Sequence, residues 1–281
     1  MRGRWLPVVL IVASGAACAG RDPTYSSDIG VEAVPVDEGS LAGWWVGQFE
    51  AASVVNVPIV GPRNGGSNSG RLVRLTWNAG AGRYDAEMTW CWADVFEVEG
   101  VRHAFDDTAL ARLRVGATTV TAEHDRGAVQ FGRVLDLWGV RDMPDPYDTE
   151  LPTHRNFSSP PQSDWVFDED QDGHPGVTDH MSGTIDGDAY VVVRTIFSPH
   201  GVARTPDQLV GLVAPERIEQ RVLDSTAAIW GIQQGAVETR QTPDPDPRAS
   251  WFQMVRIADG ATCSDVRAAR ADGRLAARRP F

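Results

Sequence analysis

Four aspartates between positions 168 and 179 have the spacing of a cation site. Asp168, Asp170 and Asp172 occupy alternate positions, Gly173 follows them, and Asp179 lies further along the chain. Carboxylates crowded this closely repel one another unless a cation neutralises them. Carboxylate and carbonyl oxygens are the ligands that Ca²⁺ takes in proteins. The sequence therefore predicts a calcium site in this segment.

Residues 168–179 resemble a calcium-binding loop of the EF-hand and dockerin type. In such loops, side-chain oxygens at positions 1, 3, 5 and 12 bind the ion, a backbone carbonyl binds it from position 7, and glycine at position 6 allows a sharp turn. The resemblance implies bound Ca²⁺ held by Asp168, Asp170, Asp172, His174 and Asp179. It implies the loop and not the EF-hand fold, because no helix is evident on either flank. A solvated acidic turn is the alternative.

The N-terminus has the composition of an export signal. Arg2 and Arg4 precede an apolar run that is too short to span a bilayer, and small residues lead from it to Cys18. This start resembles bacterial lipoprotein precursors, in which a peptidase cuts just before a cysteine that then carries lipid. The resemblance implies a signal peptide over residues 1–17 and lipidation of Cys18. Because Ala19 and not Asp follows the cysteine, it also implies an outer-membrane or cell-surface location.

Cleavage after Ala19 is the alternative, since Ala17-Cys18-Ala19 fits the ordinary small-residue rule for secretory signals. The chain would then be a periplasmic or secreted soluble protein.

Cys91 and Cys263 are predicted to form a disulfide. The chain has 3 cysteines, so these two remain as a pair in an oxidising compartment if Cys18 carries lipid. Cys91 lies on the polar face of a predicted strand, and the bond would hold the C-terminal segment against the outside of a sheet. Two free thiols are the alternative.

The residues that would mark an enzyme are scattered or absent. The sequence contains no lysine, which excludes P-loop, Schiff-base and kinase-type sites, and it has neither an H-E-x-x-H nor a G-x-S-x-G motif. His174 and His180 are interpreted as a carbonyl donor and a surface residue and not as zinc ligands. We therefore expect no catalytic residues.

The 10 tryptophans favour packing in a β core, because several share the apolar face of a predicted strand. The alternative is a platform on which sugars stack, and it would require Trp44 and Trp45, or Trp165, to face solvent.

Alternating apolar and polar residues predict a succession of strands, most clearly over residues 84–92. Asp186-Gly187 predicts a tight hairpin, residues 106–114 predict a helix, and the glycine-rich residues 65–70 predict a flexible loop. Further strands are predicted over residues 71–77, 118–124, 128–138, 180–185, 189–198, 227–240 and 249–258, and a strand is favoured over a helix at 216–224.

Short turns between consecutive strands predict an all-β fold of about 8–10 antiparallel strands, which closes most economically as an up-and-down barrel. Gly43, Trp44 and Trp45 near the first strand loosely resemble the start of lipocalin-type barrels. A two-sheet β-sandwich is the alternative. A tether over residues 18–40 precedes a single domain over 41–281, and the insertion at 139–179 departs from the lipocalin pattern.

The net charge of −12 argues against a nucleic acid as a partner. We expect an exported, lipid-anchored protein with a non-enzymatic binding or structural role, whose partner is the membrane through its lipid. The ligand is unknown: a small lipophilic ligand in an open barrel and a carbohydrate bound by exposed tryptophans are alternatives. A secreted hydrolase is a further alternative.

Overall fold

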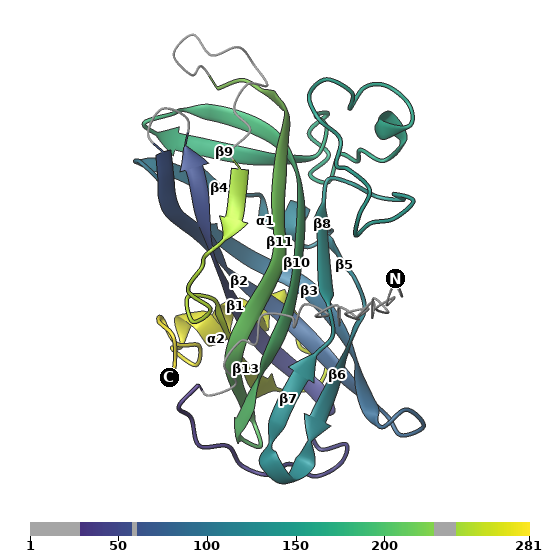
Figure 1. Ribbon diagram of the computed structural model, residues 1–281, viewed down its shortest axis with the longest axis vertical. Coiled ribbons are helices and arrows are strands. Elements are labelled where there is room, and N and C mark those ends of the chain that lie inside the picture. The colour runs from purple at the N-terminus through teal and green to yellow at the C-terminus, as the bar shows by residue number, and fades with distance from the viewer. Residues whose placement is uncertain (1–28, 58–60, 228–239) are drawn as a thin grey trace, which may run out of the picture.

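The computed structural model describes residues 29–57, 61–227 and 240–281. Within these ranges, the strands pair in one 13-stranded sheet, and the named strand pairs are antiparallel. The predicted all-β antiparallel fold is confirmed, and the strands are longer and more numerous than expected. Figure 1 shows the two longest green strands running along the long axis of the molecule.

The strands are β1 (Gly43–Val57), β2 (Gly61–Asn78), β3 (Arg83–Val95), β4 (Val101–Ala104), β5 (Arg114–Val115), β6 (Thr118–Glu123), β7 (Ala128–Phe131), β8 (Val134–Trp138), β9 (Val177–Gly183), β10 (Gly187–Thr205), β11 (Gln208–Ser225), β12 (Arg240–Pro243) and β13 (Trp251–Ile257). The helices are α1 (Asp107–Leu110) and α2 (Cys263–Ala271), with 3₁₀ turns η1 (His124–Arg126) and η2 (Gln162–Asp164).

Strand pairing closes the sheet into a ring. The strands β1, β2, β3, β6, β7, β10, β11 and β13 pair in this order, which is also their order along the chain, and β13 returns to β1. The remaining described strands attach beside this path, as β8 and β9 do on β10. The closure is therefore ring-like, and the sheet does not form a regular barrel.

The glycine-rich residues 65–70 were predicted to form a loop, and this prediction is wrong. They belong to β2 and pair with β1, from Gly65 opposite Ser53 to Gly70 opposite Gln48. A Cβ on Gly70 would lie 1.9 Å from the indole nitrogen of Trp92. Glycine is present here because a bulky neighbour approaches the strand closely, and that need cannot be seen in the composition.

The helix predicted over residues 106–114 is a single turn, α1, and Asp106 caps it by accepting a hydrogen bond from the Thr108 amide. The favoured strand at 216–224 is part of β11. Asp186 lies in the turn between β9 and β10, and Gly187 is the first residue of β10. Helix α2 was not predicted. Most of the strand expected at 227–240 lies outside the described residues.

Residues 29–40 do not behave as a free tether. Val36 is buried, and its amide donates to the carbonyl of His124. The folded part of the chain therefore begins before Leu41.

Trp45, near the start of β1, lies in the main apolar cluster. Its indole is fully buried and donates to the Leu41 carbonyl at 3.0 Å. The Arg256 guanidinium lies 4.4 Å above the indole and donates to the carbonyls of Ala42 and Ser40. An arginine on β13 thus ties the start of β1 to the strand that completes the ring.

The interior of the ring holds two apolar clusters with a buried ion pair between them. One cluster contains Phe49 and the other contains Trp90. Arg71 on β2 contacts both rings, and it donates two hydrogen bonds, of 3.0 and 2.7 Å, to Asp136 on β8. Both charged residues are at most 2% exposed. Neither could have been placed in the core from the strand pattern.

The predicted disulfide is confirmed: Cys91 and Cys263 are bonded, with their Cα atoms 5.0 Å apart. The bond fixes the first turn of α2 to the outer face of β3. Val266 and Ala269 of α2 then pack against Val46, Leu72 and Trp92, which would otherwise form an apolar patch on the outside of the ring. The C-terminal segment is therefore part of the fold.

Candidate metal-binding loop

The structure brings together three of the predicted calcium ligands. One carboxylate oxygen each from Asp168, Asp170 and Asp172 lies within 4.8 Å of the other two. The turn is held by the Asp168 carboxylate, which accepts from the amides of Gln171 and Gly173 at 2.6 and 2.9 Å. Gly173 has a φ of 89°, a value that glycine adopts without strain. The predicted role of this glycine in a sharp turn is consistent with this geometry.

Thr178 at the start of β9 connects the loop to the sheet. Its amide donates to Asp170 at 2.7 Å, and its hydroxyl donates to Asp172 at 2.6 Å. The other oxygen of Asp170, Oδ1, is buried and has no hydrogen-bond partner. Burial raises the pKa of Asp170, and the nearby Asp168 and Asp172 carboxylates add to this rise. An uncompensated carboxylate oxygen at the centre of an acidic cluster is the group that a cation would satisfy.

Asp172 shows the opposite behaviour. Burial alone would raise its pKa, but hydrogen bonds from the Thr178 hydroxyl and the His174 amide outweigh burial and lower the pKa. The loop therefore presents a stabilised carboxylate beside an unsatisfied one.

The side chain of His174 lies flat on Tyr190 of β10, with ring centroids 4.0 Å apart and planes inclined by 6°. Burial raises the pKa of the Tyr190 hydroxyl, and the carboxylates of Asp188, Asp172 and Asp224 raise it further. The stacked ring holds the second half of the loop against β10 and leaves the His174 backbone as its expected contribution to a metal.

Asp179 does not join the three other aspartates. It follows Thr178 on β9, and neighbouring residues of a strand point to opposite faces of the sheet. Its carboxylate is buried and lies 2.8 Å from Nδ1 of His103 on β4. His180 pairs instead with Asp188, 2.7 Å away, and is exposed as predicted. The regular alternation of β9 thus separates the twelfth position of the loop from the first five.

The insertion at residues 139–179 is held by contacts of its own. Val140, Met143 and Leu151 pack against Val192 of β10 and Leu223 of β11. An insertion of this length therefore has a small apolar core.

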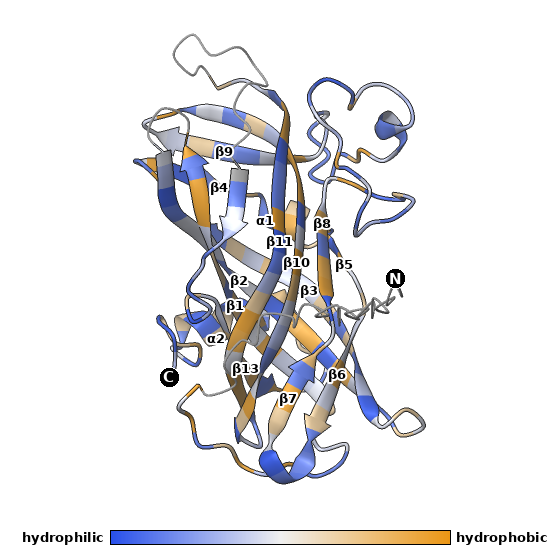
Figure 2. Cartoon of the chain, in the orientation of Figure 1, coloured by the Kyte–Doolittle hydropathy of each residue, from blue (hydrophilic) through white to orange (hydrophobic). Residues whose placement is uncertain are grey.

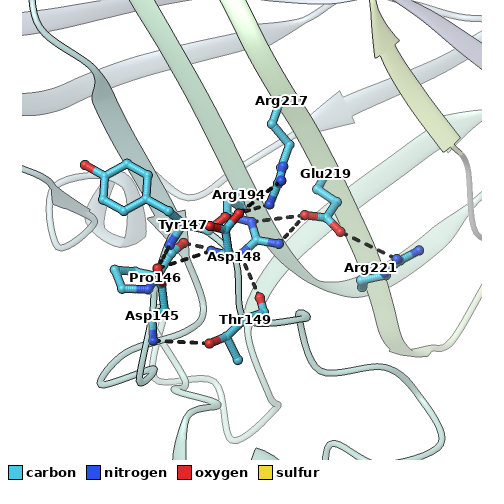
Figure 3. A network of polar contacts seen from close by, with 9 residues as sticks. All are labelled: Asp145, Pro146, Tyr147, Asp148, Thr149, Arg194, Arg217, Glu219 and Arg221. Atoms are coloured by element: carbon cyan, nitrogen blue, oxygen red, sulfur yellow. Dashed lines mark hydrogen bonds and ion pairs between the residues drawn. The ribbon is translucent and has the colours of Figure 1, made fainter. Parts of the chain in front are cut away.

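Two arginines, of which Arg194 is buried, add to this attachment (Figure 3). Arg194 on β10 is 1% exposed and donates to the carbonyls of Pro146 and Thr149 as well as to Glu219 on β11. Arg217 donates to the carbonyl of Tyr147 at 2.6 Å. The turn at 145–149 is thus fixed through its backbone carbonyls.

Two residues of the site were missed from the sequence. Thr178 was not predicted because threonine is an ordinary residue at the start of a strand. Glu169, between two predicted ligands, is 1% exposed and forms a double hydrogen bond with Arg141, so it faces the insertion and not the acidic cluster. The available signal for Glu169 was its place between Asp168 and Asp170, since neighbouring side chains of an extended segment point to opposite sides.

No family model, no curated protein and no solved structure matches this chain.

Within the described ranges, no helix is long and apolar enough to cross a bilayer. Cys18 and the predicted signal peptide lie outside these ranges. Across the described part of the chain, Phe167 is the only large hydrophobic residue that is exposed, at 38%, and Trp45, Trp90 and Trp251 are buried. Trp230 lies outside the described residues.

Proposed function

We propose that this protein is an exported, lipid-anchored protein with a non-enzymatic binding or structural role, and that it carries a structural Ca²⁺ loop. The observation that carries the calcium part is the buried, unpartnered Oδ1 of Asp170 within the cluster of Asp168, Asp170 and Asp172. Ca²⁺ prefers carboxylate and carbonyl oxygens, and extracellular sites of modest affinity are common.

These three aspartates and the His174 carbonyl would hold the ion. Its role would be local, because the rest of the insertion is fixed by its apolar cluster and by Arg194. The loop joins the insertion to β9, so the bound ion would stabilise the entry of the chain into the sheet. We expect chelation to increase proteolysis within residues 168–178 and to leave residues 139–166 protected.

We expect the Asp170→Asn variant to bind Ca²⁺ at least about tenfold more weakly than the unaltered chain, because it removes the charge of the least satisfied carboxylate. Ca²⁺ at 100 times its Kd should stabilise the unaltered protein by about 2.7 kcal/mol, since the ion binds only the folded site. Calorimetry and thermal denaturation with and without Ca²⁺ measure these effects. Asp164→Asn, an exposed acid of the same insertion, is the matched control and should bind normally. The absence of any binding at millimolar Ca²⁺ would leave the loop as an acidic turn.

Export and lipidation rest on the residues that lead to Cys18. Cells grown with labelled palmitate should incorporate the label into the unaltered protein and not into the Cys18→Ser variant. Label retained in the variant, or a mature N-terminus at Gly20, would contradict the proposed anchor.

The buried tryptophans support a packing role over a carbohydrate platform. Each described tryptophan is buried or half-buried, including Trp44, Trp45 and Trp165, which the sugar-binding alternative needs in solvent. Arg71 in the interior lies against the rings of Phe49, Trp90 and Phe197, which supports a structural role over an open lipophilic pocket.

A further inference from the structure

Five exposed arginines form a basic surface beside the C-terminal segment of this acidic protein. They are Arg204, Arg248, Arg274, Arg278 and Arg279, and we call them the C-terminal basic surface. Among the described residues, none of the five takes part in an ion pair. All five side chains are exposed, and Arg274 also contributes to lowering the pKa of Asp265, whereas the chain as a whole carries a net charge of −12.

Hydrogen bonds through the last residues bring these arginines together from three parts of the chain. Arg204, near the end of β10, donates to the carbonyl of Pro280 at 3.4 Å. Arg279 donates to the carbonyl of Arg248, which precedes β13, at 2.8 Å. Leu275, which lies between Arg274 and Arg278 in the sequence, is buried against the outer face of the ring. These contacts hold the segment in place, so the cluster is a property of the fold. Figure 1 shows the C-terminal end of the chain beside α2.

The arginines of α2 itself are used differently. Arg267 pairs with Asp107 at 2.9 Å, and Arg270 pairs with Asp94 and lies over Trp92. These contacts fix the helix. In the part of the chain that the structure describes, Arg274, Arg278 and Arg279 form no ion pair, although Arg279 lies 5.7 Å from the ring of Phe281. Ion pairing therefore does not explain these arginines. Figure 2 shows hydrophilic residues along this C-terminal segment, next to the hydrophobic residues of the ring.

The basic surface lies where the N-terminal segment meets the domain. The amide of Val34 donates to the carbonyl of Ala203 at 2.8 Å, and Arg204 is the next residue. The ten residues from 19 to 28 separate Cys18 from the described chain, and fully extended they span at most about 36 Å. A lipid on Cys18 would therefore keep this side of the domain near the membrane.

We infer that the C-terminal basic surface docks the domain onto an anionic membrane. Guanidinium groups bind phosphate oxygens with paired hydrogen bonds, and arginine suits this recognition better than a point charge does. The rest of the molecule carries the excess acid, which an anionic bilayer repels, so one orientation is favoured. This docking rests on the proposed lipid anchor only in that the lipid would keep the domain close to the membrane.

The test measures binding without the lipid. The chain from residue 19 onward is mixed with vesicles of phosphatidylglycerol or of phosphatidylcholine at low salt, and the bound fraction is measured by co-sedimentation. We expect binding to phosphatidylglycerol only, with a loss on the order of 100-fold for Arg274→Gln/Arg278→Gln/Arg279→Gln, at about a factor of five per charge. Binding should also weaken as salt screens the surface.

The matched control removes three exposed arginines elsewhere, as Arg74→Gln/Arg83→Gln/Arg155→Gln, and should bind within about twofold of the unaltered chain. Melting curves confirm that each variant is folded. Equal binding to both lipids, or equal loss in the two triple variants, would overturn the inference. Self-association in the absence of vesicles that only the C-terminal variant abolishes would assign the surface to a second copy of the chain, which also overturns it. The lipid label on Cys18 is measured separately, so either result can fail alone.

Discussion

The Arg71→Met variant should lose about 3–5 kcal/mol of its free energy of unfolding, because it leaves the Asp136 carboxylate buried without its partner. Asp136 is 1% exposed, and both its oxygens accept hydrogen bonds from Arg71. The guanidinium also packs on Trp90 at 4.0 Å, and this contact is lost with the charge. Urea denaturation followed by circular dichroism measures the change.

The control for this prediction is Arg74→Met, three residues along the same strand. Its side chain is 52% exposed and its nearest carboxylate is 3.9 Å away, so the expected change is within about 0.5 kcal/mol. The double variant Arg71→Met/Asp136→Leu should recover most of the loss, since no charge then stays buried. A single variant as stable as the unaltered protein would show that the pair is not buried in solution.

Replacing both cysteines, as Cys91→Ala/Cys263→Ala, should lower the free energy of unfolding by up to about 5 kcal/mol. The bond closes a loop of 172 residues, and the entropy that it removes from the unfolded chain grows with loop length. The contacts of α2 with Trp92 and Leu72 remain in the variant, so the helix should stay in place at low temperature and detach first on heating.

Limited proteolysis shows which part of the chain loses stability in the double cysteine variant. Cleavage within residues 260–281 should appear in the double variant well below the temperature at which the ring unfolds, and the unaltered oxidised protein should resist it. Simultaneous loss of the helix and the ring would contradict a peripheral role for the bond.

The sequence predicted the all-β class and most strands because alternation survives wherever one face is buried, as in residues 84–92. It failed where a local signal had another cause. Gly65 to Gly70 looked like a loop, but they lie in a strand, where Gly70 makes room for Trp92. Val36 looked like part of a tether because a single apolar residue has no periodicity, although it is buried against the ring.

The acidic loop was predicted from the spacing of its aspartates. The structure brings Asp168, Asp170 and Asp172 together around a turn at Gly173, as that spacing implied. Asp179 was grouped with it by position in the loop pattern, whereas strand alternation directs it toward His103 on the other face. The arginines at the C-terminal end were not singled out, because the net charge of the whole chain conceals a local excess of the opposite sign. The pairing of Arg71 with Asp136 joins residues 65 positions apart, which no local pattern reveals.

The pairing of β1 with β13 sets a condition on the time course of folding. Trp44 lies opposite Ile257, so the ring cannot close until residues 251–257 have joined a strand made near the beginning of the chain. If the chain crosses a membrane with its N-terminus first, the edge of β1 that pairs with β13 stays unpaired until nearly the whole polypeptide has crossed. Such long-range contacts slow folding, and an open strand edge invites pairing with other chains. The interval before the last strand arrives is therefore when this protein most needs protection from aggregation.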